Sequence, residues 1–221
     1  MNSSLEFLQM IKNQSDSQRK ATVKNSKTII EEKTNKASGL IAVIDTETNW
    51  HDQVMSLGVA LADESSFKLT DQRYYIFEPE CRIGGMYVGV MHHGSVKEIS
   101  SDRKTALADL KRFLTDNGIE KIFAYNAKFD YNHLPELQEF MWYDIMRIAA
   151  YKQYNSAIPD SLPCCKTGRL KTNYGVEPIT CLLTGDNRYR EIHNAVYDAI
   201  DELRIMELLG HPLERYECAK L

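Results

Sequence analysis

The sequence predicts one α/β domain with a mixed sheet. Three observations support this prediction: a continuous apolar run at Leu40–Ile44, two strand-like segments that follow it closely, and a later alternation of helical and strand patterns. Strands joined by short turns pair antiparallel, whereas strands separated by helices usually pair in parallel. The chain has 221 residues, which suits one sizeable domain, since domains usually hold about 100–200 residues.

The first half of the domain reads as three strands. Leu40–Ile44 contains no polar residue, which is typical of a strand buried on both faces. Further strands are predicted at Val54–Ala62 and Tyr74–Phe77, with turn residues Asp63–Ser66 between them. Because these strands follow one another directly, we expect them to form a meander.

The second half alternates helices with strands. Apolar side chains recur at helical spacing in Arg103–Leu114, and Lys121–Tyr125 reads as another buried strand. A helix is expected again at Tyr143–Tyr154. The last helix begins near Asn194 and ends at Gly210, because glycine readily adopts the left-handed conformation that closes a helix.

Residues 1–39 differ in composition from the rest of the chain. They carry seven basic and four acidic side chains, and most of the others are Ser, Asn, Gln and Thr. Such a segment buries too little apolar surface to offset its ordering entropy, so we expect a flexible basic arm or linker. The alternative is an arm that lies on nucleic acid or docks on a partner. The domain then covers residues 40–212, and residues 213–221 form a C-terminal tail.

The composition excludes several classes of protein. With 43% hydrophobic and 26% charged residues, the chain is neither disordered nor collagen-like. A net charge of -4 argues against a protein that grips long duplex DNA through many phosphates. The longest apolar run, Leu40–Ile44, is far shorter than the roughly 20 residues of a membrane span. Because the N-terminus also lacks the apolar centre of a signal peptide, we expect a cytoplasmic, intracellular protein. Five cysteines without a CxxC pair indicate reduced thiols.

Two acidic residues follow the buried first strand. Asp45 and Glu47 are two positions apart, so on an extended chain both carboxylates point to one side of the strand's end. Like charges placed side by side require a cation, and the carboxyl ends of strands are where ligands bind in open α/β sheets. The alternative is a pair of solvated acids in a turn.

Two later segments also place acids at the ends of elements. The strand at Lys121–Tyr125 runs into Asp130, and His193 and Asp198 lie at the start of the last helix. If both were helical, His193 and Asp198 would stand about 140° apart, so His193 fits better on the turn before the helix. Taken singly, each has an ordinary alternative: a turn residue for Asp130, a surface or capping histidine for His193, and a solvated helix acid for Asp198.

In combination these segments resemble a known family. The order Asp45-x-Glu47, then Asn-x-x-Phe-Asp ending at Asp130, then His193-x(4)-Asp198 is similar to the three motifs of the DnaQ-like, or DEDDh, 3′-to-5′ exonucleases. The resemblance covers roughly residues 40–209. It implies an α/β, RNase H-like exonuclease fold in which helices flank a central mixed five-stranded sheet.

The resemblance also implies a site. In such enzymes four carboxylates hold two divalent cations, Mg²⁺ or Mn²⁺, and the matching residue of the third motif, His193, is the general base. The matching carboxylates are Asp45, Glu47, Asp130 and Asp198. Oxygen ligands favour these hard ions over zinc, and a zinc site built on the adjacent cysteines 164 and 165 has poor chelate spacing. The residues expected to contact substrate are Thr46, Glu47, Thr48, His93 and Asn126.

Three details concern this chain in particular. His93-Gly94 falls where the family has a His-Gly-Ile turn near the nucleotide, although the neighbouring His92 makes the alignment ambiguous by one. Asp144 falls near a family aspartate that usually supports the fold. Trp50 stands close to a position where the family often has glycine, and it either stacks on a terminal base or packs beside the strand.

We therefore expect a metal-dependent 3′-to-5′ exonuclease that hydrolyses phosphodiester bonds at the 3′ end of single-stranded or frayed DNA, in proofreading, repair or trimming. Two alternatives stay open: an exoribonuclease on the same scaffold, and a catalytically idle nucleic-acid-binding module. The expected partners are a single-stranded 3′ end and, through residues 1–39, a polymerase or another repair or replication protein, with no membrane. The rim of the site could be lined by Lys166, Arg169, Lys171, Arg188 and Arg190.

Overall fold

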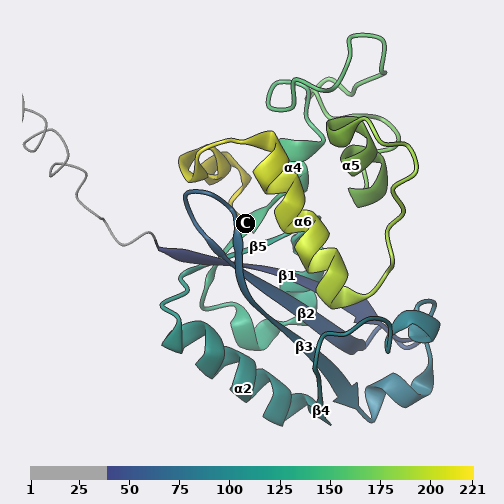
Figure 1. The fold of residues 1–221 in the computed structure, drawn as a ribbon, viewed down its shortest axis with the longest axis vertical. Helices are drawn as coiled ribbons and strands as arrows, with labels where there is room; N and C mark the ends of the chain where they lie inside the picture. The colour runs from purple at the N-terminus through teal and green to yellow at the C-terminus, as the bar shows by residue number, and fades with distance from the viewer. Residues whose placement is uncertain (1–38) are drawn as a thin grey trace, which may run out of the picture. The chain divides into compact units, whose positions relative to one another are not determined.

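A computed structural model describes residues 39–221 of the chain. The arm expected at residues 1–39 falls, except for its last residue, outside the described residues. The described domain is built on one mixed sheet with the strand order β4-β3-β2-β1-β5-β6 (Figure 1). The strands are β1 (Leu40–Thr48), β2 (Val54–Asp63), β3 (Leu69–Glu78), β4 (Glu98–Asp102), β5 (Lys121–Ala124) and β6 (Met141–Asp144).

The first three strands form the expected meander. β1 pairs antiparallel with β2, and β2 pairs antiparallel with β3. β4 is parallel to β3, while β5 is parallel to β1 and β6 to β5. β1 therefore lies inside the sheet, which explains its apolar run: residues 41–44 have 0% exposed surface. The expected α/β plan with a mixed sheet is confirmed.

The sheet has six strands rather than the expected five. The prediction of a helix at Tyr143–Tyr154 is also wrong. β6 occupies the start of that segment, and the helix that follows, α4, covers only Met146–Ala149. A short apolar strand cannot be distinguished from a helical turn by periodicity. β4 gives little signal because it is a polar edge strand whose one apolar residue is Ile99.

Helices cover both faces of the sheet (Figure 1). α2 (Arg103–Asp116) packs on the face to which Ala42 and Ile44 of β1 point. α6 (Ala195–Leu209) packs on the other face, together with α5 (Val176–Thr184), against Ile41 and Val43. The remaining short elements are α3 (Lys128–His133) and the 3-10 helices η1 (Glu80–Ile83), η2 (Val88–Val90), η3 (Pro135–Leu137) and η4 (Leu213–Ala219).

Residues 213–221, expected from the sequence as a C-terminal tail, pack against the domain. Tyr216 of η4 is fully buried and meets the ring of Phe123 edge to face. The N–H of Leu221 donates to the carbonyl of Trp142 (3.0 Å), so the C-terminal residues cover the outer edge of β6. None of the helices in residues 39–221 is long and apolar enough to cross a membrane. The five cysteines are free thiols.

The start of α6 lies very close to β2. A Cβ atom on Gly58 would sit 2.1 Å from the carbonyl oxygen of Ala195 and 2.3 Å from the Cα of Val196. Gly58 is also the partner of Asp45 in the β1–β2 register. A glycine inside a strand often marks the close approach of another backbone. Here that approach brings the first turn of α6 over the carboxyl end of β1.

Replacing Gly58 with alanine should destabilise the domain by about 1–3 kcal/mol, because the added methyl group overlaps the backbone of α6. Equilibrium unfolding in urea measures this difference. Gly89→Ala is the matched control, since no atom lies within 4 Å of a Cβ built at Gly89. A Gly58→Ala protein as stable as the control would show that the position of α6 does not depend on this contact.

Candidate active site

The candidate site lies at the carboxyl end of β1. The pairing of β1 with β2 runs without interruption from Asp45 to Glu47, and a bulge follows only after Glu47. Both side chains therefore project to the same face as Ile41 and Val43, which is the face that α6 covers. The two acids belong to the strand itself and not to a solvated turn beyond it.

The beginning of α6 brings two more groups to this point. A carboxylate oxygen of Glu47, one of Asp198 and a ring nitrogen of His193 all lie within 4.8 Å of one another. Asp198 is in the first turn of α6 and is 3% exposed. His193 precedes the helix in a left-handed conformation with a φ of 60°. Because His193 is not helical, it can face the same target as Asp198.

Asp130 approaches the site from α3. It is 2% exposed, and its Oδ1 accepts a hydrogen bond of 2.7 Å from the hydroxyl of Thr46. Asp45 and Asp130 do not belong to the 4.8 Å group of Glu47, His193 and Asp198. The negative charge of Asp130 nevertheless contributes to the raised pKa values of Asp45 and Glu47, so these acids are close neighbours.

Burial and mutual repulsion raise the pKa values of these carboxyl groups. Burial is the largest cause, and the charges of Asp198 and Glu191 add to it at Glu47, whose pKa rises to about 8. Burial and the charge of Glu191 also raise the pKa of Asp198 to about 8. The pKa of Asp130 rises to about 7, and that of Asp45 rises well above its usual value. At neutral pH the site therefore retains protons unless a cation supplies positive charge.

His193 and the residue after it are held by contacts with the segment at residues 87–91. The His193 ring stacks on Tyr87, with centroids 4.1 Å apart and planes 16° from parallel. Asn194 is buried, and its amide donates to the carbonyls of Val90 (2.9 Å) and Met91 (3.1 Å). Burial lowers the pKa of His193, so the neutral ring, which can accept a proton, predominates near pH 7.

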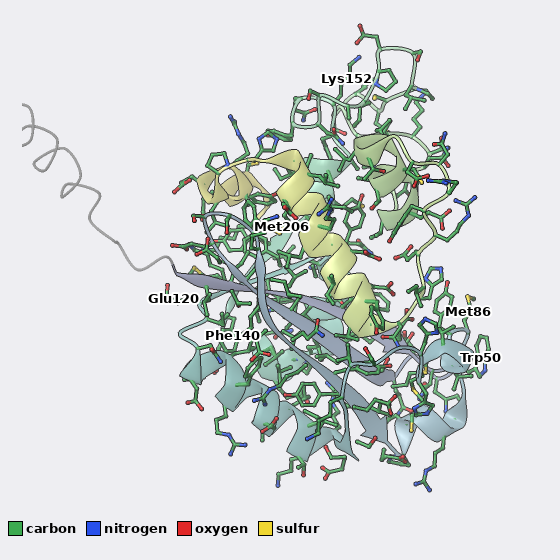
Figure 2. All side chains as sticks on the ribbon, in the orientation of Figure 1. Trp50, Met86, Glu120, Phe140, Lys152 and Met206 are labelled. Carbon is green, nitrogen blue, oxygen red and sulfur yellow. The ribbon has the colours of Figure 1, made fainter. Side chains whose placement is uncertain are left out.

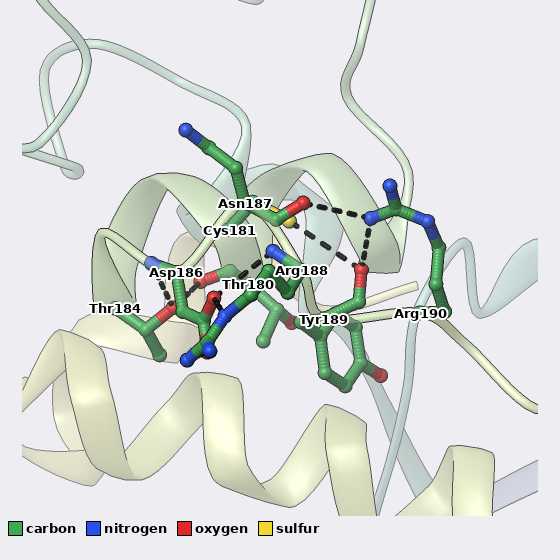
Figure 3. Close-up of polar contacts among 8 residues, drawn as sticks. All are labelled: Thr180, Cys181, Thr184, Asp186, Asn187, Arg188, Tyr189 and Arg190. Atoms are coloured by element: carbon green, nitrogen blue, oxygen red, sulfur yellow. Dashed lines mark hydrogen bonds and ion pairs between the residues drawn. The ribbon is translucent and has the colours of Figure 1, made fainter.

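The loop that leads from α5 to His193 is held by polar contacts (Figure 3). The hydroxyl of Tyr189 donates to Asp201 on α6, which ties this loop to the helix. Arg188 pairs with Asp186, and Arg190 donates to backbone carbonyls of the loop. Two of the basic residues expected at the rim therefore have partners within the chain.

The turn at His93-Gly94 lies against Tyr197, the residue before Asp198. Gly94 has a φ of 92°, and a Cβ atom there would sit 1.9 Å from the Tyr197 hydroxyl. The ring of His93 meets Tyr197 edge to face at 6.2 Å, whereas His92 contacts an acid of β4. Of the two histidines that the sequence leaves ambiguous, His93 is the one beside the helix that carries Asp198.

The other expected contact residues lie at or just beyond the carboxyl ends of β1 and β5. Thr48 is half-buried at the end of β1, and Asn126 is exposed with a φ of 61°. Trp50 is 65% exposed, so it does not pack into the core. The backbone N–H of Trp50 donates to the carbonyl of Gly84 (3.0 Å), and Figure 2 shows Trp50 and Met86 at the same end of the domain.

Nothing in the three motifs points to Glu202. It lies four positions after Asp198 on the same side of α6, is 2% exposed, and has the largest effect of any neighbouring charge on the pKa of Asp45. The signal that could have indicated it is the i, i+4 spacing from Asp198, which places two residues on one helix face. Tyr87 has no comparable signal, because its contact with His193 joins segments far apart in the sequence.

The donor set fits a divalent cation. Oδ1 of Asp198 is buried and has no hydrogen-bond partner among the described residues. The acids around it repel one another, and hard oxygen ligands of this kind suit Mg²⁺ or Mn²⁺. Among residues 39–221, no cysteine belongs to a group with metal-binding geometry.

Solved structures of exonucleases have the same fold. E. coli ExoI in a zinc-bound complex with single-stranded DNA matches with a TM-score of 0.53 and 13% identity, over 78% of this chain and 40% of that chain. A 3′-exonuclease that recognises the 3′ end of a histone mRNA stem-loop matches with a TM-score of 0.57 and 12% identity, over 89% of this chain and 73% of that one.

A third match is the nuclease domain of 3′hExo, a DEDDh family member, bound to rAMP. Its TM-score is 0.52 at 12% identity, over 80% of this chain and 96% of that chain. No family model matches the chain, and no curated protein matches it. The described domain thus has the RNase H-like fold of the DEDDh exonucleases, as the motifs predicted. Identities this low show the fold alone.

The raised pKa values predict that the protein without metal loses stability as the pH rises. The folded state binds protons at Glu47 and Asp198 up to about pH 8, whereas the unfolded chain releases them near its ordinary values of 4.5 and 3.8. Unfolding is therefore increasingly favoured as the pH rises through this window. We expect thermal midpoints in EDTA to fall between pH 5 and pH 8, and Mn²⁺ to restore them most at pH 8.

Two variants test the origin of this pH effect, one inside the site and one control outside it. Asp198→Asn removes one titrating group and should reduce the pH dependence, whereas Asp116→Asn on the exposed surface of α2 should leave it unchanged. A metal-free midpoint that stays level from pH 5 to pH 8 would contradict the electrostatic account.

Proposed function

We propose that this domain is a metal-dependent 3′-to-5′ exonuclease acting on the 3′ end of single-stranded or frayed DNA. The observation that carries the proposal is the convergence of Glu47, His193 and Asp198 within 4.8 Å at the end of β1. Phosphodiester hydrolysis needs a site for cations and a base beside it, and this cluster offers both. The shared fold with 3′ exonucleases supports the same conclusion.

The proposed cofactors are two divalent cations, Mg²⁺ or Mn²⁺. Their proposed ligands are the four carboxylates Asp45, Glu47, Asp130 and Asp198. Bound ions of this kind activate the attacking water and offset the charge that develops on the phosphoryl and leaving oxygens. The burial of several acids with raised pKa values supports this assignment, because such a cluster is unfavourable until positive charge compensates it.

His193 is proposed as the general base. A ring nitrogen of His193 would take a proton from the attacking water, and its lowered pKa keeps the ring neutral near pH 7. The stack on Tyr87 and the anchored Asn194 restrict the movement of the ring. His193 is thereby held beside Glu47 and Asp198, where the reaction would take place.

The proposed substrate contacts are Thr46, Glu47, Thr48, His93 and Asn126, with Trp50 stacking on a base. The exposure of Trp50 supports stacking over packing. The hydroxyl of Thr46 already donates to Asp130, so Thr46 also supports Asp130 in this geometry.

The second candidate function is an exoribonuclease on the same scaffold. It is favoured by the structural matches that contain RNA components, a histone mRNA stem-loop and rAMP. The buried acid set and His193 argue against an idle binding module, since a carboxylate cluster of this kind has no role in gripping phosphates. A partner that binds residues 1–39, a role in DNA repair and a cytoplasmic location stay predictions.

The central test is digestion of single-stranded DNA and RNA of one sequence, labelled at the 5′ end, with Mg²⁺, Mn²⁺ or EDTA. We expect a ladder that shortens from the 3′ end only when metal is present. Asp45→Asn and Asp198→Asn should abolish cleavage, while His193→Ala should retain activity lowered by about 10²–10⁴-fold. Asp116→Asn should cleave like the wild type. Full turnover by Asp45→Asn would end the proposal, and retardation of both oligonucleotides without shortening would indicate a binding module.

Trp50→Ala should raise KM with little change in kcat. Base stacking contributes about 1–3 kcal/mol per base, which corresponds to about a 5- to 150-fold increase in KM. Steady-state kinetics on a short oligonucleotide measures the two constants. Leu69→Ala is the control, because Leu69 is also exposed but lies at the opposite end of the sheet. Unchanged KM in Trp50→Ala would show that this side chain does not contact the substrate.

A further inference from the structure

Glu202 is a buried carboxyl group that none of the three motifs uses. It lies on α6, is 2% exposed, and forms no ion pair with a basic side chain among the described residues. Burying an acid without a cationic partner is unfavourable, whereas an apolar side chain would fill the same position at lower cost. The contacts of Glu202 must therefore explain why an acid occupies this position.

The contact that Glu202 makes is with the backbone of another motif. Its Oε2 accepts a hydrogen bond of 3.0 Å from the N–H of Tyr125. Tyr125 directly follows β5 and begins the turn that leads into α3, the helix that carries Asp130. Four positions before Glu202, the same helix carries Asp198. One hydrogen bond thus connects the helix of Asp198 with the turn that precedes Asp130.

The turn itself depends on such contacts. Asn126 has a positive φ of 61°, a conformation that residues other than glycine adopt at a cost. The backbone N–H of Asn126 donates to Oδ1 of Asp144 (3.0 Å), and the backbone N–H of Met146 donates to the same oxygen. Consecutive backbone N–H groups of this turn are therefore held by acids from two different elements, Asp144 at the end of β6 and Glu202 on α6.

We propose that Glu202 is a positioning residue: by accepting the N–H of Tyr125 it fixes the turn between β5 and α3 against α6, and so sets Asp130 relative to Asp198. This inference rests on the proposed nuclease function. The essential property of Glu202 is the reach and the acceptor oxygen of its side chain, and its charge is not required.

Two conservative variants separate these properties. Glu202→Gln keeps the length and an acceptor oxygen but removes the charge, whereas Glu202→Asp keeps the charge but is one methylene too short to reach Tyr125. We expect Glu202→Gln to retain the kcat of the wild type. Glu202→Asp should lower kcat by about 10- to 100-fold with KM unchanged, because a misplaced ligand impairs the reaction more than binding. Glu207→Gln and Glu207→Asp, farther along the same helix, serve as controls and should behave like the wild type.

Hydrogen exchange of the Tyr125 amide supplies a readout that does not depend on activity. The amide should stay protected in Glu202→Gln and exchange faster in Glu202→Asp, with amides in β2 unchanged in both, which also shows that the variants are folded. Wild-type kcat and a protected Tyr125 amide in Glu202→Asp would overturn the inference. So would a Glu202→Gln protein that keeps the amide protected but loses activity, since charge would then be the essential property.

The two proposals fail in different ways. If the wild type shortens no oligonucleotide with either metal, the proposed function is wrong, while amide exchange still decides whether Glu202 holds the turn. If the wild type is active and Glu202→Asp is equally active, the nuclease proposal stands and the positioning role of Glu202 is wrong.

Discussion

The site depends on the close contact between the first turn of α6 and β2 at Gly58. The absence of a side chain at Gly58 lets the backbone at Ala195 approach the sheet far more closely than a Cβ would permit. Because Gly58 pairs with Asp45 across the β1–β2 register, this contact determines where Asp198 stands relative to the strand acids. A side chain at this position would overlap the backbone of Ala195 and Val196, at the start of the helix that carries Asp198.

The candidate site brings several buried carboxyl groups close together, which is unfavourable when they are ionised. Acids from β1, α3 and α6 lie together in a buried place, and burial is the largest cause of their raised pKa values. Repulsion from neighbouring carboxylates raises the pKa values of Asp45, Glu47 and Asp198 further. Such a cluster does not stabilise the fold, because apolar side chains of similar volume would fill the same space without a desolvation penalty. A cation that binds between the acids removes the conflict, which is why the geometry supports metal-dependent chemistry.

Position is controlled by contacts between segments that are distant in sequence. Tyr87 and Asn194 hold the region of His193, Tyr189 ties the preceding loop to α6, and Glu202 reaches the turn before Asp130. Each of these contacts joins one motif to an element outside it. The motifs contain the candidate site residues, and the residues around them hold the segments on which those side chains lie.

The sequence alone was sufficient for the α/β class, for the buried β1, for the α6 helix that ends at Gly210, and for the order of the three acid motifs, because apolar periodicity, turn residues and motif spacing are local signals. It could not distinguish the short β6 from a helix or recognise the polar edge strand β4. Only the tertiary structure revealed the stacking of Tyr87 on His193 and the contact of Glu202 with Tyr125. Such contacts arise when the sheet brings distant segments together, and no local pattern in the chain encodes that proximity.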